Sequence, residues 1–177
     1  MRTVNKNLEV FKTLFYPLPL KTIQTFFFLF LLTASLQGAA QVQTLHGRVV
    51  GIADGDTFTL LVQDSLQMKV RVAHIDCPER KQPFSQKAKQ FTSDAIFGKT
   101  VTVFYDKKDR YGRIIGEVYY QGGRNLSEEL VKNGLAWHYV KYSKSKRLQL
   151  LEARTRSQGV GLWSQPNAIA PWDWRKQ

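Results

Sequence analysis

Charged and reactive side chains crowd into one ten-residue stretch, RVAHIDCPER at residues 71–80, which follows a run typical of a β-strand. The stretch contains two arginines, a histidine, an aspartate, a cysteine and a glutamate. A simple turn needs none of these groups. The stretch is therefore a candidate for binding or catalysis.

The spacing within this stretch suggests a cation site. Arg71 and Asp76 are five residues apart, so in a continuous strand their side chains would point to opposite faces. If both serve one site, the chain must bulge or turn between them. Pro78 favours an extended conformation at Cys77, which places Asp76, Cys77 and Glu79 on the loop that leaves the strand. Two carboxylates and a backbone carbonyl on such a loop suit a hard cation, Ca²⁺ or Mg²⁺.

Two other interpretations of the same residues stay open. Cys77 and His74 could form a thiolate–imidazole metal site, although His46 and His138 are single and unpaired in the sequence. The arginines and carboxylates could also be plain salt bridges. Cys77 is the only cysteine, which excludes an intramolecular disulfide and a cysteine-rich zinc site.

Two further segments extend the set of charged residues: Asp54-Gly55-Asp56-Thr57 and DKKDRYGR at 106–113. Either segment alone is an ordinary turn signal. When water attacks a phosphodiester, negative charge grows on the equatorial oxygens. A metal ion and guanidinium groups stabilise that charge, and a carboxylate can accept the proton of the water. The three segments together contain the groups that this reaction needs.

Hydrophobic patterning predicts an α+β fold, mainly β, that could position these segments. Alternating and β-branched runs predict five strands, at residues 45–53, 57–62, 68–75, 100–105 and 114–120. Helical patterns cover residues 84–99, 126–134 and 145–159. Five short strands with three helices are compatible with a five-stranded β-barrel of the OB-fold, although periodicity alone allows other α+β folds.

Helix boundary signals refine that prediction. Pro83 suits the first turn of the first helix, and Gly98 suits its end. Asn125 is expected to cap the second helix, which Gly134 would end. The fold domain is expected to cover residues 41–164, and residues 165–177, rich in tryptophan and proline, form a C-terminal tail.

The first forty residues predict an export signal. Basic residues precede the uncharged run TFFFLFLLTASL at 25–36, which is too short to span a bilayer comfortably. Gly38 and Ala40 provide small residues for cleavage near Ala40. The expected location is secreted or periplasmic, with membrane contact only through this segment before cleavage. An uncleaved anchor is the alternative.

Net charge indicates a polyanionic partner. The formal net charge of the 177-residue chain is +12, and the first forty residues hold four basic residues and one acidic residue, so residues 41–177 keep +9. Such a surplus suits nucleic acid, an acidic polysaccharide or a membrane surface. The chain contains 43% hydrophobic residues, enough to form a core.

The ordered motifs resemble the staphylococcal nuclease (thermonuclease) family. They are DGDT, an arginine five residues before DCPE, then DRYGR, then NLSEELVKNGLAW, and the likeness runs from about Val49 to Trp163. The resemblance implies an OB barrel with three helices and a Ca²⁺-dependent phosphodiesterase that acts on DNA and RNA. A monomer without a stable protein partner is expected.

The resemblance also implies roles for individual residues. Asp56 and Asp76 match calcium ligands, and Cys77 stands where the family gives a backbone carbonyl to the ion. Glu79 matches the carboxylate assigned as general base. The residues that match phosphate- or nucleotide-contacting groups are Arg71, Arg113, Tyr111 and Tyr142. A second family tyrosine aligns with Val140, unless the register slips to Tyr139.

Two other functions are alternatives to the nuclease. A barrel that binds nucleic acid without catalysis resembles degenerate members of this family, which lack the set of acids and arginines retained here. A structural or adhesive barrel that binds acidic polysaccharide would explain the charge but not the acids at strand ends. The site residues favour the nuclease.

Overall fold

The structure is a computed structural model of the chain, and it describes Lys21 and residues 41–177. The predicted export signal, apart from Lys21, lies outside the described residues. Among the residues that the structure does describe, no helix is both long enough and apolar enough to cross a bilayer.

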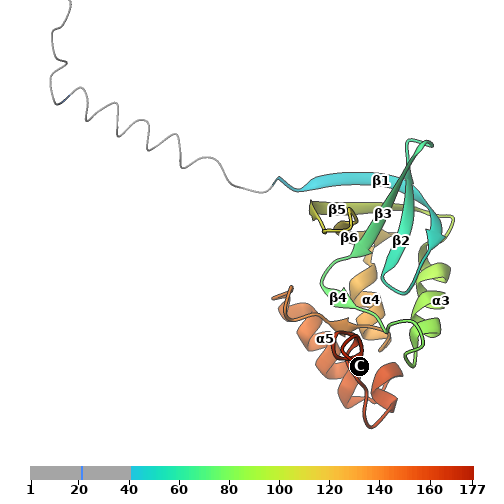
Figure 1. Ribbon diagram of the computed structural model, residues 1–177, viewed down its shortest axis with the longest axis vertical. Coiled ribbons are helices and arrows are strands. Elements are labelled where there is room, and N and C mark those ends of the chain that lie inside the picture. Colours follow the sequence, from blue (N-terminus) through green and yellow to red (C-terminus); the bar gives the residue numbers. More distant parts are fainter. Residues whose placement is uncertain (1–20, 22–40) are drawn as a thin grey trace, which may run out of the picture. The chain divides into compact units, whose positions relative to one another are not determined.

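Five strands form a closed barrel, as predicted (Figure 1). They are β1 (Gln43–Ile52), β2 (Thr57–Val62), β3 (Leu66–Val72), β5 (Thr100–Lys108) and β6 (Ile114–Tyr120). Neighbours run antiparallel in the order β3-β2-β1-β5-β6, and a parallel pairing of β3 with β6 closes the sheet. Closure removes the open sheet edges, and the ends of β2, β3 and β6 come together near one rim.

Alternating residues of the strands fill the barrel. In β6, for example, every second residue from Ile114 to Tyr120 is buried, and the residues that alternate with them are half-buried. Phe58 and Leu60 of β2 meet them from the facing side of the core cluster. Each such apolar side chain contributes about 1.5–3 kcal/mol by leaving water.

Helices cover the open ends and sides of the barrel. They are α3 (Ser85–Ile96), α4 (Leu126–Lys132), α5 (Lys146–Ser157), the 3-10 turn η1 (Gly161–Ser164) and α6 (Pro171–Trp174). Asn125 caps α4 as predicted, because its side chain accepts a hydrogen bond from the Glu128 N–H at 3.1 Å. The three predicted helices are present, and α6 is an addition within the expected tail.

Two local predictions were wrong. Pro83 does not lie in the first turn of a helix, because α3 begins at Ser85 after Phe84, whose φ of 67° belongs to the left-handed region. The strand predicted for residues 68–75 is also broken. β3 ends at Val72, and β4 (Ile75–Asp76) follows after a turn at His74, whose φ is 70°. The turn that the shared site required between Arg71 and Asp76 therefore exists.

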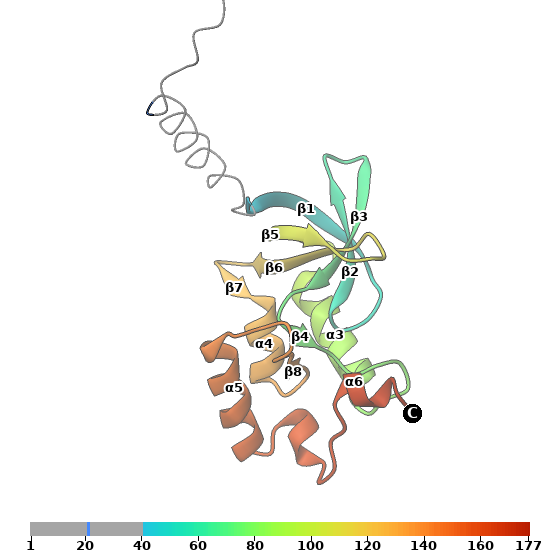
Figure 2. The same ribbon diagram turned by 60° about the vertical axis from the view of Figure 1, so that its left-hand side comes forward.

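The C-terminal segment 165–177 packs on the domain through a second apolar cluster. Trp137, Leu162 and Ala170 form its buried centre, and Trp163 and Trp172 pack against them. Gln82 donates a hydrogen bond from Nε2 to the carbonyl of Ile169 at 2.6 Å. Figure 2 shows the result: α6 lies beside the segment that links β4 to α3, next to the chain end.

Candidate active site

One pocket of ≈ 1020 Å³ lies at the rim where the ends of β2, β3 and β6 meet. All eight residues predicted from the sequence line it: Asp56, Arg71, Asp76, Cys77, Glu79, Tyr111, Arg113 and Tyr142. They come from five separate parts of the chain. The fold therefore brings together the residues that the motifs had marked one by one.

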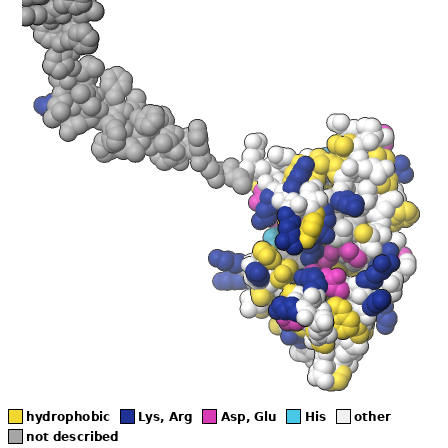
Figure 3. Space-filling view, viewed as in Figure 1, with side chains coloured by type: hydrophobic (Ala, Val, Ile, Leu, Met, Phe, Trp, Pro, Cys, Tyr) yellow, Lys and Arg dark blue, Asp and Glu magenta, His cyan; other side chains and the backbone are white. Residues whose placement is uncertain are grey.

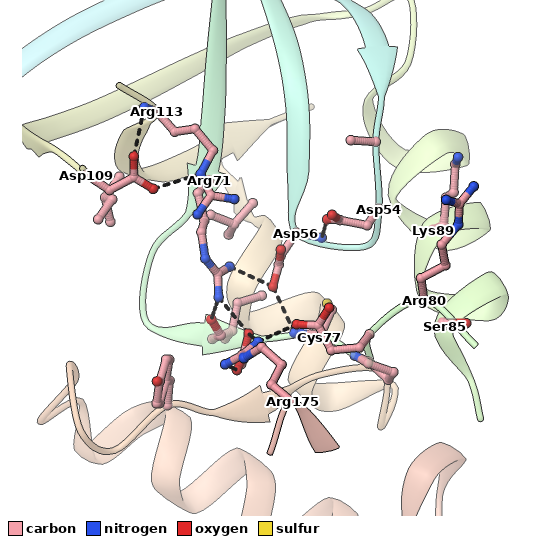
Figure 4. A pocket seen from close by; sticks show the side chains of 18 of the residues that line it. Asp54, Asp56, Arg71, Cys77, Arg80, Ser85, Lys89, Asp109, Arg113 and Arg175 are labelled. Atoms are coloured by element: carbon pink, nitrogen blue, oxygen red, sulfur yellow. Dashed lines mark hydrogen bonds and ion pairs between the residues drawn. The ribbon is translucent and has the colours of Figure 1, made fainter. Parts of the chain in front are cut away.

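Arg71 lies at the centre of the pocket, between two buried carboxylates (Figure 4). Its Nη1 lies 2.7 Å from Oδ2 of Asp56, and its Nη2 lies 2.6 Å from Oδ1 of Asp76. The β2–β3 register produces the first pair, because Thr57 stands opposite Arg71. The turn at His74 produces the second, because it returns the chain towards β3.

Burial and charge act against each other in this cluster. Desolvation disfavours the charged form of Arg71, but Asp56 and Asp76 outweigh it, so the pKa of Arg71 is raised. Desolvation raises the pKa of Asp76, and hydrogen bonding from Arg175 opposes that rise. At the pocket rim, desolvation by burial and the charge of Asp56 raise the pKa of Asp54 to about 6.

The Asp54–Asp56 loop is tied to the segment after β4. Oδ2 of Asp56 accepts the Cys77 N–H at 2.8 Å, and Thr92 of α3 donates to the Gly55 carbonyl at 2.6 Å. A Cβ at Gly55 would come within 2.7 Å of the Ala88 Cβ and 2.9 Å of the Cys77 sulfur. Glycine is needed here because the loop passes close to α3.

Cys77 contributes backbone to the site, while its thiol faces the core. The residue is 4% exposed, and burial raises the pKa of its thiol well above the usual value. The ring of His74 contacts Glu117 instead, with Nε2 3.0 Å from Oε1. The two groups of the alternative thiolate–imidazole site are therefore engaged elsewhere.

The β5–β6 hairpin carries Arg113 and Tyr111. Nε of Arg113 donates to Oδ2 of Asp109 at 2.7 Å, and Oδ1 of Asp109 accepts the Tyr111 and Arg113 N–H groups. Desolvation would raise the pKa of Asp109, but the hydrogen bonds from Arg113 and Tyr111 together outweigh it and lower that pKa. Among the described residues no acceptor engages the two terminal nitrogens of Arg113, so they are available to a ligand.

Tyrosines form another part of the pocket. Tyr111 and Tyr142 are each 68% exposed, whereas Tyr139 stacks on Trp172 with ring centroids 5.0 Å apart and an interplanar angle of 7°. Val140, at the position where the family has a second tyrosine, is also exposed. Both Tyr139 and Tyr142 line the pocket, with rings edge to face at 4.8 Å.

Sequence reasoning missed Arg175, which follows α6. Its Nη2 lies 2.7 Å from Oδ2 of Asp76, and its Nη1 makes an ion pair with Oε1 of Glu79. Asp76 and Glu79 thus share this guanidinium. The ion pairs join positions 99 and 96 residues apart, a separation at which no local pattern can indicate contact. The available signal was the density of tryptophans, which indicated packing of the segment.

Acidic and basic side chains are arranged concentrically on this face. In the space-filling view, acids gather near the middle of the face, and lysines and arginines surround them (Figure 3). Arg80, Lys89 and Arg110 are among the basic residues that line the pocket. Such a basic rim attracts a polyanion towards a centre that holds carboxylates.

The donor chemistry of the pocket fits a hard cation. Asp56 and Asp76 provide carboxylate oxygens, and the Cys77 backbone lies against Asp56. Within the described part of the chain, no three or more His, Cys, Asp or Glu side chains are grouped closely enough to form a metal cluster. A hard cation bound here would have few charged protein ligands and would need water or substrate oxygens to complete its shell.

A small β-barrel with two buried acids, a nearby glutamate and several arginines at one rim defines a class of protein equipped for phosphoryl-group chemistry. The sequence model described as "Staphylococcal nuclease homologue" matches residues 69–165, more than half of the chain. The chain belongs to this family, which confirms the resemblance seen in its motifs.

Named relatives agree with the family. The chain is 42% identical over 132 residues to an Escherichia coli protein called "Uncharacterized endonuclease", covering 74% of this chain and 85% of that protein. A Haemophilus influenzae protein of the same name is 43% identical over 130 residues, covering 73% and 72%. The "Micrococcal nuclease" of Shigella flexneri is 42% identical over 141 residues, covering 74% and 80%. The prediction of a hydrolase of the nuclease class is confirmed.

Proposed function

We propose that the protein is a Ca²⁺-dependent nuclease that hydrolyses phosphodiester bonds of both DNA and RNA. The observation that carries this proposal is the convergence, around one pocket, of two buried carboxylates, a third carboxylate and two arginines from separate elements. The family membership and the nuclease names of the relatives support the reaction class.

Asp56, Asp76 and the Cys77 carbonyl would hold the ion. When bound, Ca²⁺ supplies positive charge that polarises a phosphate oxygen and orients the attacking water. The ion would have few protein ligands besides these. It therefore binds weakly without substrate and more tightly when a substrate phosphate completes its coordination shell.

Glu79 acts as the general base. Its carboxylate accepts a proton from the attacking water, and the oxygen of that water forms the new bond to phosphorus as the bond to the leaving oxygen breaks. Its side chain is 36% exposed, in contrast to 2% for Asp76, so water reaches Glu79 far more readily. A general base of this kind contributes about 10²–10⁴ in rate.

Arg71 and Arg113 stabilise the charge that develops on the phosphoryl oxygens. Arg113 keeps its two terminal nitrogens available because Asp109 binds Nε. Arg71 is held in place by Asp56 and Asp76, so it needs little rearrangement to meet a phosphate bound in the pocket. Tyr111 and Tyr142 lie exposed in the pocket lining, where they can contact the nucleotide.

The decisive experiment is cleavage of plasmid DNA and of a defined RNA by residues 41–177, with Ca²⁺ and with excess chelator. We expect cleavage of both substrates with Ca²⁺ and none in chelator. Full cleavage in chelator would refute the metal requirement. Binding of DNA without cleavage under any metal would favour the non-catalytic barrel.

Glu79→Gln separates catalysis from binding. The amide keeps the size of the side chain but accepts no proton as a carboxylate does. We expect Ca²⁺-dependent nucleotide affinity to survive while turnover falls about a hundredfold or more. Loss of affinity together with rate would instead make Glu79 a metal ligand or a structural residue.

We also propose that the protein acts outside the cytoplasm, after cleavage near Ala40. The basic residues before the apolar run at 25–36, and the small residues after it, support this location. N-terminal sequencing of the exported protein tests the proposal. A mature chain that still begins at Met1 and fractionates with membranes would support an anchor instead.

A further inference from the structure

The C-terminal segment reaches the catalytic pocket through one residue, Arg175. Its guanidinium contacts both Asp76 and Glu79, the expected metal ligand and the expected general base. The matched family region ends at residue 165, so this contact comes from a part of the chain outside it. The family's shared mechanism therefore does not account for it.

The contact is built into the fold. Ala170 and Pro171 are buried, and Trp172 stacks on Tyr139 and lies edge to face with Trp137 at 5.7 Å. The backbone N–H of Arg175 donates to the Pro171 carbonyl at 3.1 Å. The helix α6 thus fixes the base of the Arg175 side chain beside the pocket.

The side chain itself remains able to move. The Arg175 side chain is 40% exposed, whereas that of Arg71 is 16% exposed and lies between two acids. Desolvation disfavours the charged form of Arg175, but the hydrogen bonds that Arg175 donates to Asp76 and Glu79 outweigh this effect and raise its pKa. Attraction to the acids and the anchored backbone hold the Arg175 side chain in this position. Because the side chain is partly exposed, it can turn away from the acids into solvent.

We infer that Arg175 is a cation-competing residue, which binds Asp76 and Glu79 in the metal-free enzyme and thereby sets the affinity for Ca²⁺. This inference rests on the proposed Ca²⁺ site. A divalent ion and a guanidinium both require the carboxylate oxygens of Asp76, so binding of Ca²⁺ must displace or redirect Arg175. A positive charge left nearby would further repel the ion.

The sign of the effect is therefore fixed. Removal of the Arg175 charge leaves Asp76 with Arg71 as its remaining cationic partner among the described residues, and it releases Glu79. Calcium then has less to displace. We expect Arg175→Gln to bind Ca²⁺ about tenfold more tightly, which corresponds to about 1.4 kcal/mol.

Lys176→Gln is the matched control. It removes the same unit charge from the adjacent residue, but Lys176 pairs with Asp173 of α6 and makes no ion pair with either pocket acid. A chain ending at Trp174 provides a second test, because it removes Arg175 and keeps α6. Isothermal titration calorimetry with CaCl₂, alone and with a deoxynucleotide 5′-phosphate, measures the affinity directly.

Tighter Ca²⁺ binding in Arg175→Gln and in the shortened chain, with an unchanged Lys176→Gln, supports the inference. Equal or weaker binding in Arg175→Gln overturns it, as does an equal gain in all three variants, which would reflect bulk charge alone. If wild-type protein cleaves DNA in Ca²⁺ while Arg175→Gln leaves the affinity unchanged, only this inference fails. If neither the wild-type protein nor any variant binds Ca²⁺, the proposal that Ca²⁺ is the cofactor is refuted as well.

Discussion

Arg71→Gln should destabilise the folded protein far more than the equivalent change at Arg113. Arg71 pairs with Asp56 and Asp76, whose side chains are 8% and 2% exposed, while its own is 16% exposed. Loss of one partner from a buried ion pair costs about 3–5 kcal/mol, because a charge is left without compensation. Asp76 keeps Arg175, so we expect the lower end, about 3 kcal/mol.

Arg113→Gln is the control for loss of an active-site arginine. Its pair with Asp109 involves side chains that are 27% and 14% exposed at the tip of a hairpin. A pair of this kind contributes at most about 1 kcal/mol. The measurement is urea unfolding in chelator, followed by tryptophan fluorescence. For a domain of this size, 3 kcal/mol corresponds to a fall of roughly 10 °C in Tm.

Calcium provides a second measurement on the same variant. If the loss is electrostatic, added Ca²⁺ should restore part of the stability of Arg71→Gln, because the ion would neutralise the uncompensated charge of the buried acids and bind the folded state. A double variant, Arg71→Gln with Asp76→Asn, should lose less than the sum of the single changes, by about 1–2 kcal/mol. Equal small losses at Arg71 and Arg113 would refute the reasoning.

Three other outcomes are expected. Cys77→Thr should retain most Ca²⁺-dependent activity, because the side chain faces the core. The thiol of the folded wild-type protein should react with iodoacetamide at least about a hundredfold more slowly than the thiol of the urea-unfolded protein, because it is buried and its pKa is raised. Burial lowers the pKa of His138, so below about pH 6.5 this histidine binds a proton more readily in the unfolded chain than in the folded protein. The unfolding free energy measured by urea titration should therefore decline as pH falls below that value, and it should decline less in His138→Gln. Trp172→Ala should lower the unfolding free energy by about 2 kcal/mol, since it removes the stack on Tyr139; an unchanged urea midpoint would mean that α6 is not docked.

Much of the barrel could be predicted because its signals are local. Each strand carries its own alternation, and β6 keeps it without interruption from Ile114 to Tyr120. The cap of α4 was equally accessible, since Asn125 and the Glu128 N–H are three residues apart. The local signal misled at Pro83, because Phe84 adopts a left-handed conformation that is sterically disfavoured for phenylalanine, and α3 begins only after it.

The residues of the pocket could be predicted from the sequence, but the contacts between them could not. Asp56, Arg71 and Asp76 were marked by residue type and motif, whereas their ion pairs depend on the β2–β3 register and on the turn at His74. The packing requirement at Gly55 could not be predicted for the same reason. A sequence shows a turn residue there, and the need for space against Ala88 arises only when α3 packs.

Arg175 shows where sequence reasoning ends and what the fold adds. A protein whose carboxylates are to hold a cation must also be stably folded before the cation binds. Burial of unpaired acids lowers the stability of that folded state. Arg71 and Arg175 reduce that cost at Asp76, one from the barrel and one from the C-terminal segment. Under the proposed Ca²⁺ site, the guanidinium of Arg175 that stabilises these acids also competes with the ion. The low affinity for Ca²⁺ that we propose in the absence of substrate would then follow in part from how this protein stabilises its buried acids.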